Sequence, residues 1–199
     1  MKRLAAVVAG VLLLGSNAVA QTDTLKGVRD GSIELGVAGG VSVPVGDYAD
    51  WAALSGTGGI IVGYYSSPRL SFGADWGGHW HTGTEEADSL LGSEAGFRVY
   101  RILTPYVKFQ LQVDKVSPYL TGLAGLYLQE VKWSEMQLGG TVTNTLTQGY
   151  LGVALGAGVQ MVSDDNVLVF LEGKFHTASR SDAAPIQFFD VRAGLAFLL

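Results

Sequence analysis

The sequence predicts an all-β protein, an eight-stranded antiparallel up-and-down transmembrane β-barrel. Three observations lead to this class. Apolar residues make up 48% of the 199 residues, yet after the first twenty no apolar run reaches the about 20 residues that a membrane-spanning helix needs. Apolar and polar residues instead alternate with the two-residue period of a strand. The connections between the alternating segments are short and long in turn, which is typical of barrels that cross a membrane.

Composition excludes several kinds of site. The chain has no cysteine, which rules out a disulfide framework, a zinc–thiolate site and a cysteine nucleophile. The formal net charge of −5 offers no basic surface, so no nucleic-acid partner is expected. The paired glycines lack the lysine and the helix of a phosphate-binding loop, and we expect no cofactor.

Residues 1–20 are interpreted as a cleaved signal peptide. Lys2 and Arg3 precede an apolar segment over 4–15, and Ala18-Val19-Ala20 has the form of a cleavage site. The alternative is a membrane anchor, but about 12 apolar residues are short for a span. We therefore expect cleavage near Ala20 and one domain, a β-barrel over residues 21–199.

Eight strands are expected in this domain. They cover residues 33–42, 58–65, 70–81, 97–113, 118–131, 150–161, 167–176 and 189–199. The second and fifth have the weaker alternation. In the fourth, the odd positions from Phe97 to Val113 are mostly apolar and are expected to share one face. Pro105 has no N–H for the ladder, which indicates a bulge or a break there.

The connections are expected to separate into two ends of the barrel. Residues 66–68, 114–117 and 163–166 carry the Pro, Asp, Ser and Asn of tight turns. Longer polar connections are expected over 44–56, 82–92, 134–146 and 178–185. Short turns at one end and long loops at the other match a transmembrane barrel.

Alternation alone does not decide which face lies inside, because a soluble lipocalin-like barrel has an apolar interior. Charges of both signs on the polar face favour a polar lumen. The expected network consists of Glu34, Glu172, Lys174, His176, Asp190 and Arg192. Small residues such as Gly36, Ala38 and Gly152 share this face and would relieve crowding in a narrow barrel.

Aromatic residues support the same orientation. They fall near expected strand ends, where interface aromatics of a membrane barrel lie, and we expect lipid-facing or interfacial roles for Trp51, Tyr64, Trp76, Trp80, Tyr119 and Trp133. The alternative for these side chains is ordinary core packing.

Four segments make the chain resemble the eight-stranded outer-membrane β-barrel family that includes the OmpA and OmpX transmembrane domains. They are Val43–Tyr48, Ser117–Tyr127, Leu171–Phe175 and the alternating last strand. The resemblance implies an integral protein of a Gram-negative outer membrane, in contact with outer-membrane lipid and lipopolysaccharide. It also implies insertion by the barrel-assembly machinery, which reads the C-terminal strand. Members usually end in Phe or Trp, whereas here Leu199 is last and Phe197 lies on the same face.

The expected function is non-enzymatic, a structural role in envelope integrity or a surface-interaction role with a plugged lumen. One alternative is a lipid A-modifying hydrolase that uses His176, with Ser179 and Glu172, because a serine nucleophile needs an adjacent base. The spacing of His176 and Ser179 puts them on opposite faces of a regular strand. A second alternative is a narrow conduit for small solutes or apolar ligands, although barrels of about eight strands are filled by side chains.

His79 and His81 are candidate ligands of a metal ion, because they share a face with Asp75. Two imidazoles and a carboxylate suit a transition metal. His176 is the only other histidine, so no third ligand is evident nearby. We therefore expect polar residues of the barrel here, with no metal site and no catalytic residue.

Overall fold

The computed structural model describes residues 28, 30–91, 93–137, 140–163, 166–180 and 184–199. The expected signal peptide lies outside these residues and stays a prediction. The described residues form nine strands and two short helices, in chain order β1 Ile33–Pro44, η1 Gly46–Asp50, β2 Ser55–Ser67, β3 Leu70–Thr82, α2 Glu85–Leu91, β4 Ser93–Leu103, β5 Pro105–Gln110, β6 Val116–Gln137, β7 Gly140–Val162, β8 Val167–Ala178 and β9 Ile186–Leu198. In the part of the chain covered here, neither helix is long and apolar enough to cross a membrane.

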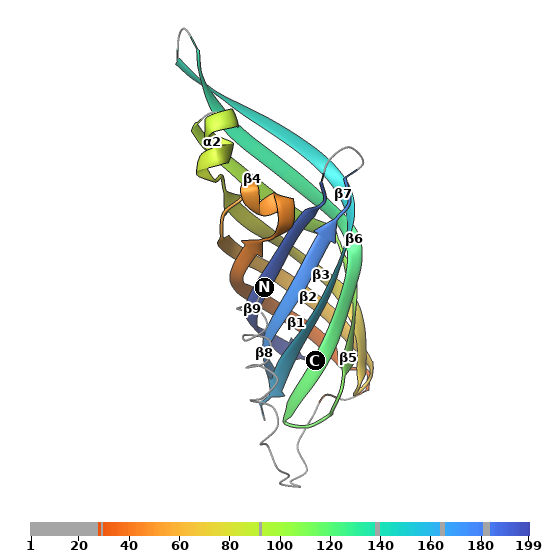
Figure 1. Cartoon of the computed structure of the whole chain (residues 1–199). Coiled ribbons are helices and arrows are strands. Elements are labelled where there is room, and N and C mark those ends of the chain that lie inside the picture. The colour runs from red at the N-terminus through yellow and green to blue at the C-terminus, as the bar shows by residue number, and fades with distance from the viewer. Residues whose placement is uncertain (1–27, 29, 92, 138–139, 164–165, 181–183) are drawn as a thin grey trace.

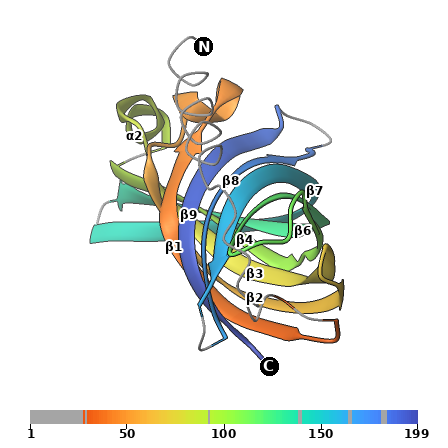
Figure 2. The ribbon, with the colours of Figure 1, turned by 90° about the horizontal axis from the view of Figure 1, so that it is seen from below.

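The strands close into a ring of eight. β1 pairs antiparallel with both β2 and β9, and the remaining strands follow in order around the wall. β4 and β5 each pair with β3 and with β6, so together they form one strand of the ring. This confirms the predicted eight-stranded antiparallel up-and-down transmembrane barrel (Figure 1; Figure 2, along the barrel).

The two ends of the barrel differ as predicted. Short turns join β2 to β3, β5 to β6 and β7 to β8, while η1, α2 and the β6–β7 hairpin gather at the opposite end (Figure 1). We call the end with the longer connections the outer end. The expected loop over 134–146 is wrong, because β6 and β7 stay paired from Val116–Met161 to Gln137–Gly140. These strands project beyond the barrel as a hairpin.

The expected strand 97–113 departs from the prediction in two ways. It ends at Gln110, and its faces exchange midway. Before the break the odd positions, such as Arg101, are buried, whereas after it the even positions, such as Lys108, are buried. The cause is a shift of register between Arg101 and Leu103, since an extra residue in one strand moves the following side chains to the other face. The break expected at Pro105 is confirmed next to it.

Burial establishes an inverted barrel. On β7, Leu151, Val153 and Leu155 are 75%, 50% and 73% exposed, while Gly152 and Ala154 between them are buried. The same pattern runs along β8 and β9. The apolar face therefore points out of the barrel, where hydrocarbon can solvate it, and the polar face points into the lumen.

Inward glycines make room for large lumen side chains, as expected. A Cβ at Gly152 would lie 2.7 Å from the ring of Tyr127, and one at Gly158 would lie 2.6 Å from the ring of Tyr119. Glycine at these positions lets the tyrosines cross the narrow interior.

Most of the aromatic residues expected at the surface are exposed, namely Trp51, Tyr64, Trp76 and Trp80. Trp80 pairs with Arg98, which bridges to Glu130 at 3.5 Å on the outer wall, so charged groups begin at its level. Trp76 lies in the middle of β3, so of the two expected roles it fits the lipid-facing one and not the interfacial one. The expectation for Tyr119 is wrong. This residue is 2% exposed inside the barrel, because its position on β6 shares the inward face with Ser117 and Thr121.

Candidate functional site in the lumen and at the outer end

The structure places all six residues of the expected lumen network inside the barrel. Glu34, Glu172, Lys174, His176, Asp190 and Arg192 are each at most 5% exposed. They come from β1, β8 and β9, which are consecutive in the ring. Some of them pair with one another, such as Lys174 with Glu172, and others pair with residues that the expected network did not contain, namely Asp75 on β3 and Lys108 on β5.

Asp75 on β3 is the centre of the network. Its carboxylate accepts from Arg192 Nη2 at 2.6 Å and from Lys174 Nζ at 3.0 Å, and Arg101 Nη1 lies at 3.3 Å. Glu172 holds Lys174 at 2.8 Å and also pairs with Arg192. Two carboxylates and three cations thus form one connected network in the middle of the lumen.

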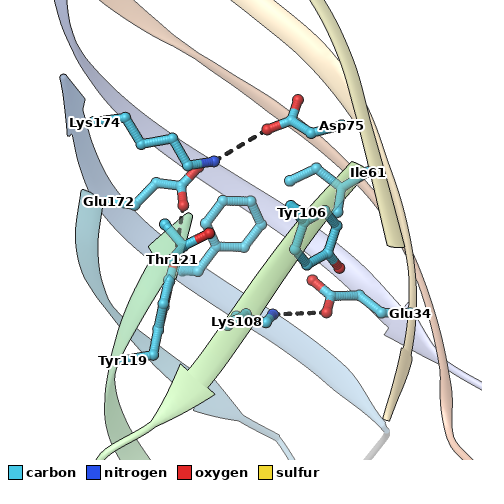
Figure 3. A pocket seen from close by; sticks show the side chains of 10 residues that line it. Glu34, Ile61, Asp75, Tyr106, Lys108, Tyr119, Thr121, Glu172 and Lys174 are labelled. Carbon is cyan, nitrogen blue, oxygen red and sulfur yellow. Dashed lines mark hydrogen bonds and ion pairs between the residues drawn. The ribbon is translucent and has the colours of Figure 1, made fainter. Parts of the chain in front are cut away.

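A second group lies toward the short turns. Lys108 on β5 donates to Glu34 at 2.7 Å and to the Gln160 side chain at 3.2 Å. Tyr119 extends between the two groups and donates to Glu172 at 3.1 Å. Figure 3 shows the Lys108–Glu34 and Lys174–Asp75 pairs reaching across the interior from opposite sides.

These groups close the lumen. Among the described residues, four acidic and four basic side chains are buried in the barrel, so their formal charges balance; they are Glu34, Asp75, Glu172, Asp190, Arg101, Lys108, Lys174 and Arg192. The cavity between the two groups measures about 20 Å³, which is room for about one water molecule. No water-filled path is evident through this level of the described barrel.

Above the ion pairs lies a histidine cluster. His176 Nε2 lies 3.2 Å from Asp190 Oδ2, and Nδ1 lies 3.0 Å from the Tyr127 hydroxyl. The ring of His79 lies against His176, with centroids 5.4 Å apart. The ring of Phe188 packs against both imidazoles, with its centroid 4.3 Å from that of His79 and 4.6 Å from that of His176.

The expectation that no third ligand lies near His79 is therefore wrong. His79 is on β3 and His176 on β8, which are four strands apart in a ring of eight and so face each other across the lumen. Asp75, in contrast, does not join the histidines, because Arg192, Lys174 and Arg101 hold it lower in the barrel. His81 contacts Ser55 Oγ and the Ala53 carbonyl instead, both at 3.0 Å.

The geometry gives no support to a His176–Ser179 pair. His176 is fully buried, and its nitrogens contact Asp190 and Tyr127. Ser179 is exposed just past the end of β8, and its backbone N–H donates to Leu151. The two side chains lie on opposite sides of the barrel wall, as their spacing indicated.

A larger cavity of about 330 Å³ opens at the outer end. The β1–β2, β3–β4 and β8–β9 connections and the paired strands β6 and β7 contribute to its lining, which consists of Asp47, Tyr48, Trp51, Leu91, Phe97, Gln129, Val131, Leu146, Gln148, Arg180, Ala184 and Pro185. Arg180 stacks over the ring of Tyr150 at 5.7 Å, and its Nε has no hydrogen-bond partner among the described residues. Burial raises the pKa of the Tyr48 phenol above its usual value, so this group stays protonated.

Several residues of the lumen network and of the outer cavity were not predicted from the sequence. Arg101 was missed because the alternation places it on the apolar face of its strand. Asp75 and Lys108 were assigned to the polar faces of their strands, and their opposite signs were the available signal for a cross-lumen pair. The outer cavity left no such signal, because its walls come from loops and strand ends that only the closed barrel brings together.

Comparison with solved structures agrees with the fold. Neisserial surface protein A superposes with a TM-score of 0.61 at 16% identity, covering 84% of this chain and 97% of its own. The attachment invasion locus protein Ail of Yersinia pestis, in complex with the heparin analogue sucrose octasulfate, superposes with a TM-score of 0.55 at 17% identity. The match covers 85% of this chain and 100% of Ail. OprG, an outer membrane protein of Pseudomonas aeruginosa, superposes with a TM-score of 0.50 at 10% identity. The match covers 87% of this chain and 96% of OprG.

No protein-family model matches the chain, and no curated protein matches it in sequence. The likeness is therefore one of fold. The chain has the architecture of the OmpA/OmpX-like outer-membrane barrels, as its motifs predicted.

Proposed function

We propose that this protein is a non-enzymatic integral outer-membrane barrel whose lumen is closed and whose outer end binds a small amphipathic anion. The observation that carries this proposal is the outer cavity, to which the β1–β2, β3–β4 and β8–β9 connections and the strands β6 and β7 all contribute. Ligand sites of small barrels are commonly found at the barrel mouth, and cavities of about 300–1,000 Å³ are typical of them.

The chemistry of the cavity suggests the class of ligand. Tyr48, Trp51 and Phe97 supply aromatic surface, and Leu91 and Val131 supply aliphatic surface. Arg180 supplies a guanidinium whose Nε has no hydrogen-bond partner in the part of the chain that the structure describes. An apolar chain or ring that carries a carboxylate or another anionic group complements such walls, because a guanidinium binds anions through charge-assisted hydrogen bonds.

A narrow conduit for small solutes or apolar ligands is less well supported than a closed barrel. The ion pairs around Asp75 fill the lumen below the cavity, and small barrels are generally filled by side chains. A lipid A hydrolase centred on His176 is also less well supported, because Ser179 lies outside the wall that encloses His176. Ail, a barrel of the same fold, was solved with a heparin analogue, which is consistent with a binding role for barrels of this size.

The location follows from the same features. An outward apolar face with exposed Leu151, Leu155 and Phe197 needs a lipid environment. We propose cleavage of the signal peptide near Ala20, insertion by the barrel-assembly machinery through the C-terminal strand, and contact with outer-membrane lipid and lipopolysaccharide.

Fluorescence of Trp51 tests the ligand proposal. The protein would carry Phe at Trp76, Trp80 and Trp133 and would be reconstituted in lipid nanodiscs. Brominated dodecanoate, which quenches tryptophan on contact, is the probe. We expect saturable quenching, and at least about 10-fold weaker binding in Arg180→Gln, because a hydrogen bond to a charged group is worth about 1.5–3 kcal/mol.

Arg98→Gln is the matched control, because Arg98 lies on the outer wall and pairs with Glu130. It should bind as the parent does. Quenching that does not saturate, or that is equal in the parent and in Arg180→Gln, would overturn the ligand proposal.

A further inference from the structure

We propose that His79, His176 and Asp190 form a binding site for a divalent transition-metal ion of the zinc and copper type inside the lumen. Each residue offers one ligand atom, and these atoms lie within 4.8 Å of one another. They come from β3, β8 and β9. This inference does not depend on the outer cavity, because it uses none of the residues that line it.

The state of His79 points to a missing ligand. Its side chain is 0% exposed, and neither ring nitrogen has a hydrogen-bond partner among the described residues. A buried polar group without a partner costs about 1–3 kcal/mol, and nearly all such groups in folded proteins are satisfied. Asp190 Oδ1, in the same cluster, also lacks a partner. A bound ion would satisfy both groups.

The kinds of ligand select the ion. Two imidazoles and one carboxylate suit Zn²⁺, Cu²⁺, Ni²⁺ and Fe²⁺, whereas Mg²⁺ and Ca²⁺ prefer sites made of oxygen. Zinc–nitrogen bonds of about 2.0–2.1 Å place tetrahedral ligands about 3.4 Å apart. The His176–Asp190 separation of 3.2 Å is close to this, so the main adjustment is a rotation of His79 toward the pair.

Tyr127 completes the site as a positioning residue. Metal-bound histidines usually have a hydrogen-bond partner on the other ring nitrogen, which sets the tautomer. The Tyr127 hydroxyl lies 3.0 Å from His176 Nδ1, and a hydroxyl both donates and accepts. It can therefore accept from Nδ1–H when Nε2 binds the ion, and donate to Nδ1 when Nε2–H instead faces Asp190.

The residues around the site influence its affinity for the metal ion and the path by which the ion would enter. Arg192 Nε lies 3.8 Å from Asp190 Oδ2 and opposes the binding of a cation, which leaves the imidazoles as the main source of affinity. His81 stacks on His79 at 6.3 Å, and Tyr48 packs edge-on against His81 at 5.6 Å. Because Tyr48 also lines the outer cavity, these rings separate the site from the outer end, and the ion would enter from there.

The test uses the full protein, extracted from membranes in detergent without a histidine tag and treated with a chelator. Co²⁺ is the probe, because its visible absorption reports on coordination, and Zn²⁺ is the competitor. We expect one Co²⁺ per chain, displaced by Zn²⁺. His79→Gln should bind at least about 100-fold more weakly, and Tyr127→Phe about 10- to 100-fold more weakly.

The matched control is His81→Gln, which removes a histidine from the same face of β3 but leaves the three ligands. It should bind within about 3-fold of the wild type, a smaller change than the loss of even an outer-shell partner. Folding of each variant would be checked by heat-modifiable gel migration. Absence of bound Co²⁺ in folded wild type, or equal binding by wild type and His79→Gln, would overturn the site, as would a His81→Gln variant that loses binding to the same degree.

X-ray absorption of the zinc-loaded wild type needs no variant and covers the case in which His79→Gln does not fold. The expected inner shell contains two imidazoles and at least one oxygen. A shell of oxygen atoms alone would overturn the proposal.

Discussion

Asp75 on β3 and Arg192 on β9, 117 positions apart in the chain, meet across the lumen with Arg192 Nη2 2.6 Å from Asp75 Oδ2. Both side chains are nearly inaccessible, at 1% and 0% exposure. Lys174 and Arg101 bind the same carboxylate. This one residue thus connects three strands, β4, β8 and β9, to β3 through the interior of the barrel.

Asp75→Asn should destabilise the barrel by about 3–5 kcal/mol, because removing one partner of a buried ion pair leaves uncompensated charge. Equilibrium unfolding by urea in lipid vesicles measures this. Glu130→Gln is the control, since Glu130 bridges Arg98 and Lys132 on the outer surface, and exposed pairs are worth about 0–1 kcal/mol. Equal effects of the two changes would contradict the network.

Gly63→Ala should destabilise the barrel by about 1–3 kcal/mol through overpacking. A Cβ there would overlap the Tyr106 hydroxyl, while the next atoms, Tyr106 Cζ and Glu34 Cβ, lie at 3.4 and 3.5 Å. Adding Tyr106→Phe should restore stability, and alone it should be nearly neutral, because this hydroxyl has no partner among the described residues.

Gly56→Ala on the same strand serves as the control for Gly63→Ala, because a Cβ at Gly56 would meet nothing within 4 Å. The same unfolding measurement applies to all four variants. If Tyr106→Phe failed to rescue Gly63→Ala, the packing of the lumen side chains would differ from that described.

Overproduction of the protein should leave lipid A unchanged. His176 is enclosed by Asp190, Tyr127, His79 and Phe188, so it has no access to a lipid substrate. Mass spectrometry of lipid A from cells that overproduce the wild type or His176→Ala checks this. Deacylated lipid A that appears with the wild type and disappears with His176→Ala would revive the hydrolase.

Single cysteines test the orientation, because the chain has none of its own. Thr143→Cys, exposed on the projecting hairpin, should react with a membrane-impermeant maleimide on intact cells. Arg69→Cys, exposed in the turn between β2 and β3, should react only after the outer membrane is permeabilised. The reverse pattern would place the short turns outside.

The period-two alternation was enough to predict the ring of eight strands and the inward face of β1, β8 and β9, because no register shift interrupts it there. It failed on β4, where the shift after Arg101 turned this residue inward and left Arg98 outward. The pairs of residues across the lumen could not be predicted for another reason. The strand that lies opposite β8 is determined only when the ring closes, and the sequence separates His176 from His79 by 97 positions.

The lumen as a plug is the central claim, and conductance across planar lipid bilayers tests it most directly. With the Asp75, Glu172, Lys174 and Arg192 side chains in contact, we predict no stable open channel after insertion of the folded wild type. Steady ohmic conductance from folded, heat-modifiable protein would contradict the closed lumen and would favour the conduit.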